Sequence, residues 1–173
     1  AWNVKPFVSD GSHFEVYDGL SKRGEVSWNV IGEHNLKNAL AALLAAQHAG
    51  VPLEQGCAAM KSFKNVKRRL EILDCVNGIT VYDDFAHHPT AIATTLKGLR
   101  NKVSDQRIIA VLELGSYTMR TGVHQHELAN SLSDADKVIF LKPQQEWDLQ
   151  AVVNRLPDKA KIIDDVEQII ADL

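Results

Sequence analysis

The chain has 173 residues, of which 45% are hydrophobic and 24% are charged, and its formal net charge is -3. This composition is typical of a globular protein that is large enough for one or two hydrophobic cores. There is no basic excess for a nucleic-acid surface, and the longest apolar run, residues 39–46, is far shorter than the roughly 20 residues of a membrane span. We therefore expect a cytoplasmic protein that binds neither nucleic acid nor a membrane.

The N-terminal part is predicted to form a small antiparallel sheet followed by two helices. Apolar and polar residues alternate over residues 14–20 and 25–30, which indicates a β-hairpin. An alanine-rich helix is expected over residues 36–48, and its apolar side chains lie almost all round, so that it should be buried. Gly50 follows as a helix stop, and a second helix is predicted over residues 53–63.

The chain has two cysteines, Cys57 and Cys75. Their spacing fits no metal-binding motif, and apolar residues surround both of them in the sequence. We therefore expect two buried core thiols without a redox role.

After a basic, non-periodic linker at residues 64–69, strands alternate with helices. Asn77-Gly78 is a strong hairpin turn, and the β-branched strand that follows it is expected to be buried. Continuously apolar strands separated by helices predict an α/β fold with a parallel sheet that is covered on both faces. The predicted strands are residues 70–75, 79–83, 107–112, 138–141 and 161–163, and the predicted helices are residues 89–100, 124–132, 146–156 and 166 onward.

Four ionisable side chains are packed into one short segment, Tyr82-Asp-Asp-Phe-Ala-His-His-Pro-Thr-Ala91. A strand is predicted to end here, and Pro89 suits the first turn of a helix because its missing N–H costs nothing there. The segment is therefore expected at the carboxyl end of a strand and beside a helix N-terminus. In open α/β sheets ligands bind at this place, where free N–H groups favour anions.

The ionisable residues of this segment are expected to have different roles. Successive side chains on a strand point to opposite faces, so Asp83 and Asp84 should not serve one site as a pair. Asp84 could accept hydrogen bonds from ribose hydroxyls, with capping of the following helix as its structural alternative. His87 is the better candidate for a contact with an anionic substrate, and we expect Asp83 and His88 to be supports.

Further side chains suit a nucleotide or a carboxylate substrate. Asn35 and Asn38 lie three residues apart at a helix start, so they share a face, and an amide offers the donor and acceptor that an adenine edge requires. Arg69 could bind phosphate oxygens in a fork, and Arg120, in a loop after a predicted strand, could bind a substrate carboxylate. The alternatives are an N-cap for Asn35 and solvated positions for the two arginines.

In chain order, three of these motifs resemble those of the Mur ligase family. Gly32-Glu-His-Asn-Leu-Lys-Asn-Ala39 is similar to the family's G-x-H-N-x-x-N-A. Arg69-Leu-Glu71 resembles the family's arginine before an apolar-acidic pair, and Asp83-Asp-Phe-Ala-His-His-Pro-Thr90 is the strongest match. The resemblance extends over residues 14–173.

The resemblance implies an α/β fold with two parts. Residues 68–173 would form most of a Rossmann-like C-terminal ligase domain with a mostly parallel sheet, truncated at its C-terminus. Residues 1–67 would form the hairpin-plus-helices tail of a central ATP-binding domain. Because the chain begins without Met and ends within a helical pattern, we interpret it as a fragment.

The resemblance also implies an enzyme. In this family ATP, with Mg²⁺, phosphorylates a carboxylate, and an amine attacks the acyl phosphate to give an amide, ADP and phosphate. The third motif is most similar to that of members that join a murein tripeptide, L-alanyl-γ-D-glutamyl-meso-diaminopimelate, to UDP-N-acetylmuramate in peptidoglycan recycling. Members that add L-alanine usually have Tyr in place of Phe85.

Roles of single residues follow from the resemblance only by position in a motif. It assigns no catalytic residue to the chain, and the metal ligands are expected mostly outside it. The phosphate-binding sequence G-x-x-x-x-G-K-[ST] is absent, so the chain alone is not expected to form amide bonds. Residues 112–119 lack the Pro-Arg of the family loop, for which Arg120 is the candidate substitute. The implied contacts are Asn35 and Asn38 with adenine, Arg69 with the phosphates, Asp84 with the ribose, and Phe85, His87 and Arg120 with the incoming peptide.

Other interpretations remain open at this stage. Within the family, the chain could belong to a member that adds L-alanine or glutamate. Outside it, Asp83, Asp84, His87 and His88 could ligate the metal of a hydrolase, although adjacent side chains diverge on a strand. The chain could also be a non-catalytic module that binds a nucleotide or a partner. No oligomeric state is predicted.

Overall fold

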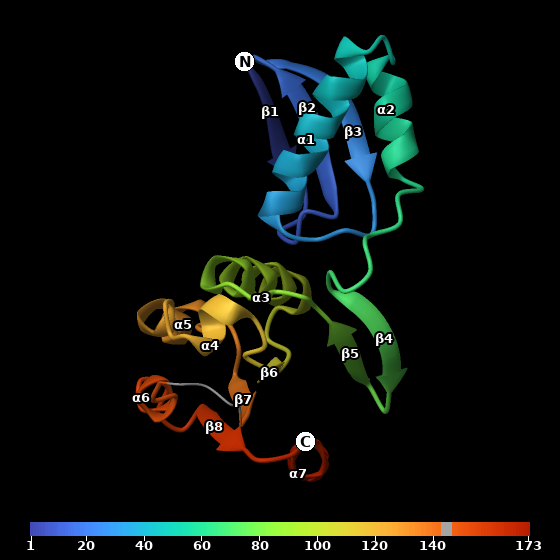
Figure 1. Cartoon of the computed structure of the whole chain (residues 1–173). Helices are drawn as coiled ribbons and strands as arrows, with labels where there is room; N and C mark the ends of the chain where they lie inside the picture. The colour runs from blue at the N-terminus through green and yellow to red at the C-terminus, as the bar shows by residue number, and fades with distance from the viewer. Residues whose placement is uncertain (143–146) are drawn as a thin grey trace. The chain divides into compact units, whose positions relative to one another are not determined.

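The computed structural model describes residues 1–142 and 147–173, and its contacts divide the chain into two compact units. Unit 1 contains Ala1–Phe85 and Lys97–Ser104, and unit 2 contains Ala86–Leu96 and Asp105–Leu173. Helix α3 (Pro89–Val103) contributes a segment to each unit (Figure 1). The contacts group residues 68–85 with the N-terminal elements, whereas the division into residues 1–67 and 68–173 stays a prediction from family architecture.

Unit 1 begins with a three-stranded antiparallel sheet in the order β1 (Trp2–Pro6), β2 (His13–Asp18), β3 (Ser21–Ser27). Buried and part-buried residues alternate along β2, so that Phe14 and Val16 face the core with 0% of their surface exposed. The predicted hairpin is confirmed, and its second strand begins earlier than expected. Strand β1 was not predicted, because it is an edge strand with mostly exposed or half-buried residues and no strict alternation.

Helices α1 (Glu33–His48) and α2 (Leu53–Met60) pack beside this sheet and complete the core of unit 1 (Figure 1). Helix α1 buries Leu36, Ala39 and Leu43, which are three and four residues apart and therefore lie on one face. The expectation that α1 is buried all round is wrong, because alanine is small enough to lie on a buried or a solvated face. Its exposed alanines include Ala41, Ala42 and Ala45.

Strands β4 (Glu71–Val76) and β5 (Ile79–Asp83) form a separate two-stranded antiparallel sheet. Asn77 and Gly78 have φ angles of 52° and 81°, as the predicted Asn-Gly turn requires, so this hairpin is confirmed. The expectation that β5 is buried is wrong, since Ile79 is 64% exposed. Branched side chains favour a strand whether or not another element covers it, so the sequence indicated the strand but not its burial.

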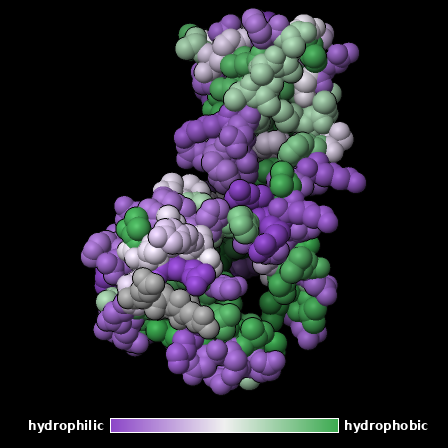
Figure 2. Space-filling model, viewed as in Figure 1, coloured by the Kyte–Doolittle hydropathy of each residue, from purple (hydrophilic) through white to green (hydrophobic). Residues whose placement is uncertain are grey.

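The β4–β5 hairpin exposes apolar side chains on both strands, and they form part of the hydrophobic surface beside β4 and β5 in Figure 2. The expectation for the cysteines is half right: Cys57 is buried, but Cys75, on β4, is exposed. Cys57 packs against Gly24, where an added Cβ would lie 2.7 Å from the Cys57 Sγ. The exposed apolar residues of the hairpin, with exposures between 45% and 64%, are Ile72, Leu73, Val76, Ile79 and Val81.

Unit 2 contains the predicted parallel sheet, in the order β6 (Ile109–Leu112), β7 (Lys137–Leu141), β8 (Ala160–Ile163). In the central strand β7, the residues Val138, Ile139 and Phe140 are 0% exposed, as a strand covered on both faces requires. The edge strand β6 departs from this expectation, because its Val111 is 49% exposed. The α/β class and the parallel arrangement are confirmed.

Five helices of the described residues belong wholly or partly to unit 2, and they include the N-terminal part of α3. The others are α4 (Tyr117–Arg120), α5 (Gln125–Ser131), α6 (Gln150–Val153) and α7 (Val166–Asp172). The short α4 was not predicted. The helix expected over residues 146–156 begins at a residue outside the described ones, and α6 is its described part. Within residues 1–142 and 147–173, every helix is too short or too polar to cross a membrane.

Candidate functional site

The segment from Tyr82 to Ala91 links two elements, as predicted. Strand β5 ends at Asp83 and helix α3 begins at Pro89, which fits the absence of an N–H on proline at a helix start. The Thr90 N–H donates a hydrogen bond of 3.2 Å to His88 Nδ1, so His88 caps the first turn of α3. The strand that ends here is β5 of the predicted β4–β5 hairpin, which forms a two-stranded sheet of its own.

The two carboxylates diverge, as the strand geometry predicted. Asp83 Oδ2 lies 3.1 Å from Arg68 Nε, while Asp84 Oδ2 accepts a hydrogen bond of 2.8 Å from the Leu70 N–H. Each carboxylate therefore faces its own group. In the part of the chain that the structure describes, no group of three or more His, Cys, Asp or Glu residues could hold a metal ion. The metallohydrolase interpretation has no support in this arrangement.

The start of α1 brings the two candidate asparagines together. Asn35 Nδ2 donates a hydrogen bond of 2.8 Å to the Ile31 carbonyl, and Asn38 Nδ2 lies 3.5 Å from Asn35 Oδ1. The two amides therefore share a face, as the spacing predicted. Gly32 caps the helix with φ 99°, and a Cβ there would lie 2.7 Å from the His34 ring, so only glycine suits this position.

His34 connects this motif electrostatically with the other two motifs of unit 1. Burial lowers the pKa of His34 below its usual value; the Asp84 carboxylate acts in the opposite direction, and the Arg69 guanidinium acts in the same direction as burial. Charges influence an imidazole in this way only when they lie near it, so Arg69 and Asp84 belong to the surroundings of the start of α1. His34 lies within the first sequence motif, but nothing in the sequence signalled that it belongs to the site.

Two adjacent arginines differ in their surroundings. Arg68 pairs with Asp83, and its Cζ lies 4.9 Å from the centre of the Phe85 ring. Arg69 is exposed, and none of the described residues forms a hydrogen bond or an ion pair with its guanidinium. The candidate phosphate ligand is thus the arginine that is accessible, and Phe85, predicted as a peptide contact, supports Arg68 with its ring.

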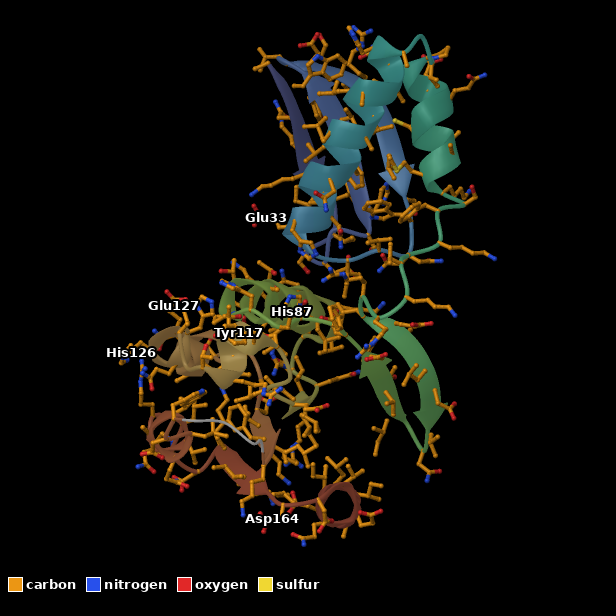
Figure 3. The ribbon with its side chains drawn as sticks, viewed as in Figure 1. Glu33, His87, Tyr117, His126, Glu127 and Asp164 are labelled. Carbon is orange, nitrogen blue, oxygen red and sulfur yellow. The ribbon has the colours of Figure 1, made fainter. Side chains whose placement is uncertain are left out.

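In unit 2 a serine joins two candidate peptide-binding segments. Ser116 Oγ donates a hydrogen bond of 3.3 Å to the His87 carbonyl and accepts one of 3.4 Å from the Met119 N–H, which caps α4. His87 is exposed, and Tyr117, which is the first residue of α4, is 81% exposed (Figure 3). The role of Ser116 was not predicted, although its place before a short helix is an N-cap signal.

Helix α4 also positions Arg120, which is the last residue of that helix and is exposed. Trp147 Nε1 donates a hydrogen bond of 2.8 Å to the Met119 carbonyl, and the Trp147 ring fills the space in which a Cβ on Gly122 would lie, at 2.7 Å. The loop that carries Arg120 is thereby held in place. Two candidate site residues, His87 and Arg120, belong to unit 2. The candidate site residues of unit 1 are Asn35, Asn38, Arg69, Asp84 and Phe85.

His88 has a second contact besides its helix cap. Its ring packs edge-on against the His124 ring, with 4.2 Å between their centres, and His124 Nδ1 lies 3.6 Å from Glu127 Oε2. His88 is therefore enclosed by structural partners. Such contacts suit a structural support, and the role of His87 as a substrate contact stays a prediction.

Comparisons with known proteins give a consistent result. Residues 68–173 match the family described as Mur ligase, glutamate ligase domain. Over 156 residues, or 89% of the chain, the sequence is 50% identical to the UDP-N-acetylmuramate–L-alanyl-γ-D-glutamyl-meso-2,6-diaminoheptandioate ligase of Haemophilus influenzae. A UDP-N-acetylmuramate–L-alanine ligase of Saccharopolyspora erythraea is 40% identical over 131 residues, or 76% of the chain.

Among solved structures, a murein peptide ligase from Psychrobacter arcticus is similar over 99% of the chain, with a TM-score of 0.64 and 39% sequence identity. The chain spans 34% of the length of the Haemophilus relative, 26% of the Saccharopolyspora relative and 38% of the Psychrobacter chain. It therefore corresponds to roughly a third of such a protein.

Proposed function

The chain belongs to the Mur ligase family, and we propose that it is the C-terminal part of an ATP-dependent ligase that joins a murein tripeptide to UDP-N-acetylmuramate. The tripeptide is L-alanyl-γ-D-glutamyl-meso-diaminopimelate. The observation that carries this proposal is the 50% identity, over 89% of the chain, to a relative named for that reaction, against 40% to a relative named for L-alanine. Both substrates and ATP are polar solutes of the cytoplasm, where we place the protein.

The side chains of unit 1 suit the nucleotide. Asn35 and Asn38 present amide groups on one face of α1, which suits an adenine edge. Arg69 is an accessible cation for phosphate oxygens, and Asp84 is an acceptor for ribose hydroxyls. The influence of Arg69 and Asp84 on the pKa of His34 supports their place in one site.

The side chains of unit 2 suit the incoming peptide. The tripeptide carries carboxylates, and Arg120 is an exposed cation on the loop that Ser116 ties to the backbone of His87. An exposed imidazole at His87 offers hydrogen bonds to the same groups. Phe85, which is 49% exposed, is a candidate peptide contact only by its place in the sequence motif.

The residues of this chain suit only part of the ATP molecule. When bound, ATP supplies the phosphoryl group that activates the muramate carboxylate. The described residues include groups for the nucleoside and for phosphate oxygens, but the sequence has no G-x-x-x-x-G-K-[ST] to cradle the phosphates. We place the Mg²⁺ ligands mostly outside these residues, and we do not expect the 173 residues alone to form amide bonds.

The proposal is tested by measuring phosphate release from ATP by the intact protein with UDP-N-acetylmuramate and one amine at a time. We expect turnover with the tripeptide and little with free L-alanine, and a product that contains muramate joined to the tripeptide by mass spectrometry. Turnover with L-alanine and none with the tripeptide would make the protein the alanine-adding member. Hydrolysis of a substrate without ATP would remove it from the ligases.

A further inference from the structure

The turn around Arg69 has an unusual backbone. Arg68 and Leu70, which flank Arg69, have φ angles of 58° and 48°. Residues other than glycine adopt this left-handed conformation rarely, because Cβ crowds the neighbouring backbone. Two such residues in a stretch of three persist only where surrounding contacts fix the chain. The structure therefore holds both neighbours of Arg69 in a conformation that the local sequence does not favour.

The contacts that fix this turn come from the end of β5. Asp84 Oδ2 accepts the Leu70 N–H at 2.8 Å, and the Phe85 N–H donates to the Arg68 carbonyl at 2.8 Å. Asp83 Oδ2 lies 3.1 Å from Arg68 Nε. Three consecutive residues, two of them in the Asp-Asp pair of the sequence motif, thus hold both neighbours of Arg69.

Side chains from the turn itself make two further hydrogen bonds to its backbone. Glu71 Oε2 accepts the Arg68 N–H at 2.9 Å, and Asn65 Nδ2 donates to the Arg69 carbonyl at 2.7 Å. The backbone before and after Arg69 is therefore fixed by hydrogen bonds to side chains. Its own side chain is exposed, so the turn presents a guanidinium from a fixed base.

We propose that Asp84 is a positioning residue, which through the Leu70 N–H directs the Arg69 guanidinium toward the nucleotide phosphates. The identity of the ligand rests on the proposed function. A carboxylate has about four lone-pair sites, so Asp84 can hold the turn and contact the ribose at once. The nucleoside and phosphate contacts are then coupled through one side chain, and losing Asp84 weakens both.

Whether Asp84 fixes the turn is tested by measuring hydrogen exchange of the Leu70 amide in the protein. In Asp84→Ala, exchange of the Leu70 amide should accelerate at least about tenfold, because its only acceptor among the described residues is lost. The matched control is Asp74→Ala, which should leave exchange at Leu70 unchanged. Among the described residues, the Asp74 carboxylate accepts a hydrogen bond only from the adjacent Cys75 N–H. Unchanged exchange in Asp84→Ala overturns the proposal.

The effect on Arg69 is tested by calorimetric titration of the intact protein with ATP and with adenosine. A residue that only contacts ribose weakens both ligands equally, whereas a positioning residue weakens ATP more. We expect Asp84→Ala to reduce the affinity for ATP at least about fivefold more than that for adenosine, and this excess to vanish when Arg69→Ala is already present. Equal losses for both ligands, or an excess that persists without Arg69, overturn the proposal.

A conservative variant separates positioning from general damage. Asp84→Asn keeps an oxygen that can accept the Leu70 N–H, so it should recover most of the preference for ATP over adenosine that Asp84→Ala loses. Recovery of neither this preference nor the Leu70 protection contradicts the proposal. If the wild-type protein binds neither ATP nor adenosine, the proposed function fails, and exchange at Leu70 alone decides whether Asp84 holds the turn.

Discussion

The two sheets of unit 1 are stabilised in different ways. The β1–β3 sheet packs Phe14, Val16 and Val26 against α1 and α2, and each of these side chains is at most 1% exposed. The β4–β5 hairpin leaves its apolar side chains 45% to 64% exposed, and its end is held by the polar contacts of Asp83 and Asp84. Burial of apolar surface is the main source of folding free energy. The first sheet therefore determines the stability of unit 1, while the hairpin carries candidate ligands on a less stable element.

The largest effect on the free energy of unfolding is expected from Phe14→Ala. The Phe14 ring is 0% exposed and packs edge-on against Trp28, with 5.7 Å between the ring centres. Its removal leaves a cavity, which should lower the free energy of unfolding by about 3–5 kcal/mol. Urea denaturation followed by circular dichroism measures this change.

The matched variant in the hairpin is Ile79→Ala. Ile79 is 64% exposed, so its truncation should cost less than about 0.5 kcal/mol in the same denaturation experiment. A cost for Ile79→Ala close to that for Phe14→Ala would break the contrast between the two sheets, because it would show that another surface covers the hairpin.

The reaction rates of the two cysteine thiols measure the same contrast in burial between the core and the hairpin. Burial raises the pKa of Cys57, which lies in the core beside α2, whereas Cys75 is exposed on β4. Because the thiolate is the reactive form, Cys57 should react with an aromatic disulfide reagent at pH 8 at least about a hundredfold more slowly than Cys75. Rates measured in Cys57→Ser and Cys75→Ser separate the two thiols, and equal rates would contradict the expected difference.

How far the sequence could predict this molecule depends on the kind of interaction. Turn and helix-start signals act locally, so Asn77-Gly78 and Pro89 were interpreted correctly. The parallel sheet followed from continuous apolar runs such as that of β7. Burial of β5 and Cys75 was predicted wrongly, because a strand's composition does not determine which element covers it.

For the candidate site, the motif residues could be named from the sequence but their contacts could not. The divergence of Asp83 and Asp84 follows from strand geometry alone. That Asp84 holds the Leu70 amide depends on a turn with two left-handed residues, and the sequence there contains no glycine to signal it. The roles of single residues in ligand binding stay predictions.

A smaller effect, confined to the hairpin, is expected from Gly78→Ala. Gly78 has φ 81°, and the added Cβ meets no atom within 4 Å, so the cost is backbone strain of about 1–2 kcal/mol. Amide exchange of β4 and β5 should accelerate while that of β2 stays unchanged. Gly50→Ala is the control, because Gly50 also has a positive φ, of 93°, and open space but lies after α1. Equal acceleration in β2 would show that the two sheets open together.

A further prediction tests whether polar contacts stabilise an element in unit 2 as well. Helix α7 packs Ile169 against Ile139 and Ile163, and Asp172, at its end, pairs with Lys137 and Lys161. The hydrogen bond from Lys137, and then that from Lys161, lowers the pKa of Asp172 below its ordinary value of 3.8.

The sign of the pH dependence follows from this direction. A lowered carboxylate pKa stabilises the folded state above the ordinary value of 3.8, and this contribution is lost as the pH falls through the lowered value. Asp172→Asn should therefore be less stable than the wild type at pH 7, and the difference should shrink below pH 4, and also in 1 M NaCl because the pair is partly exposed. Urea denaturation from pH 7 to pH 3 measures it. A difference that stays constant with pH and salt would contradict an ionic contribution of Asp172. No difference at any pH would mean that the apolar contacts of Ile169 hold α7 without the lysine pairs.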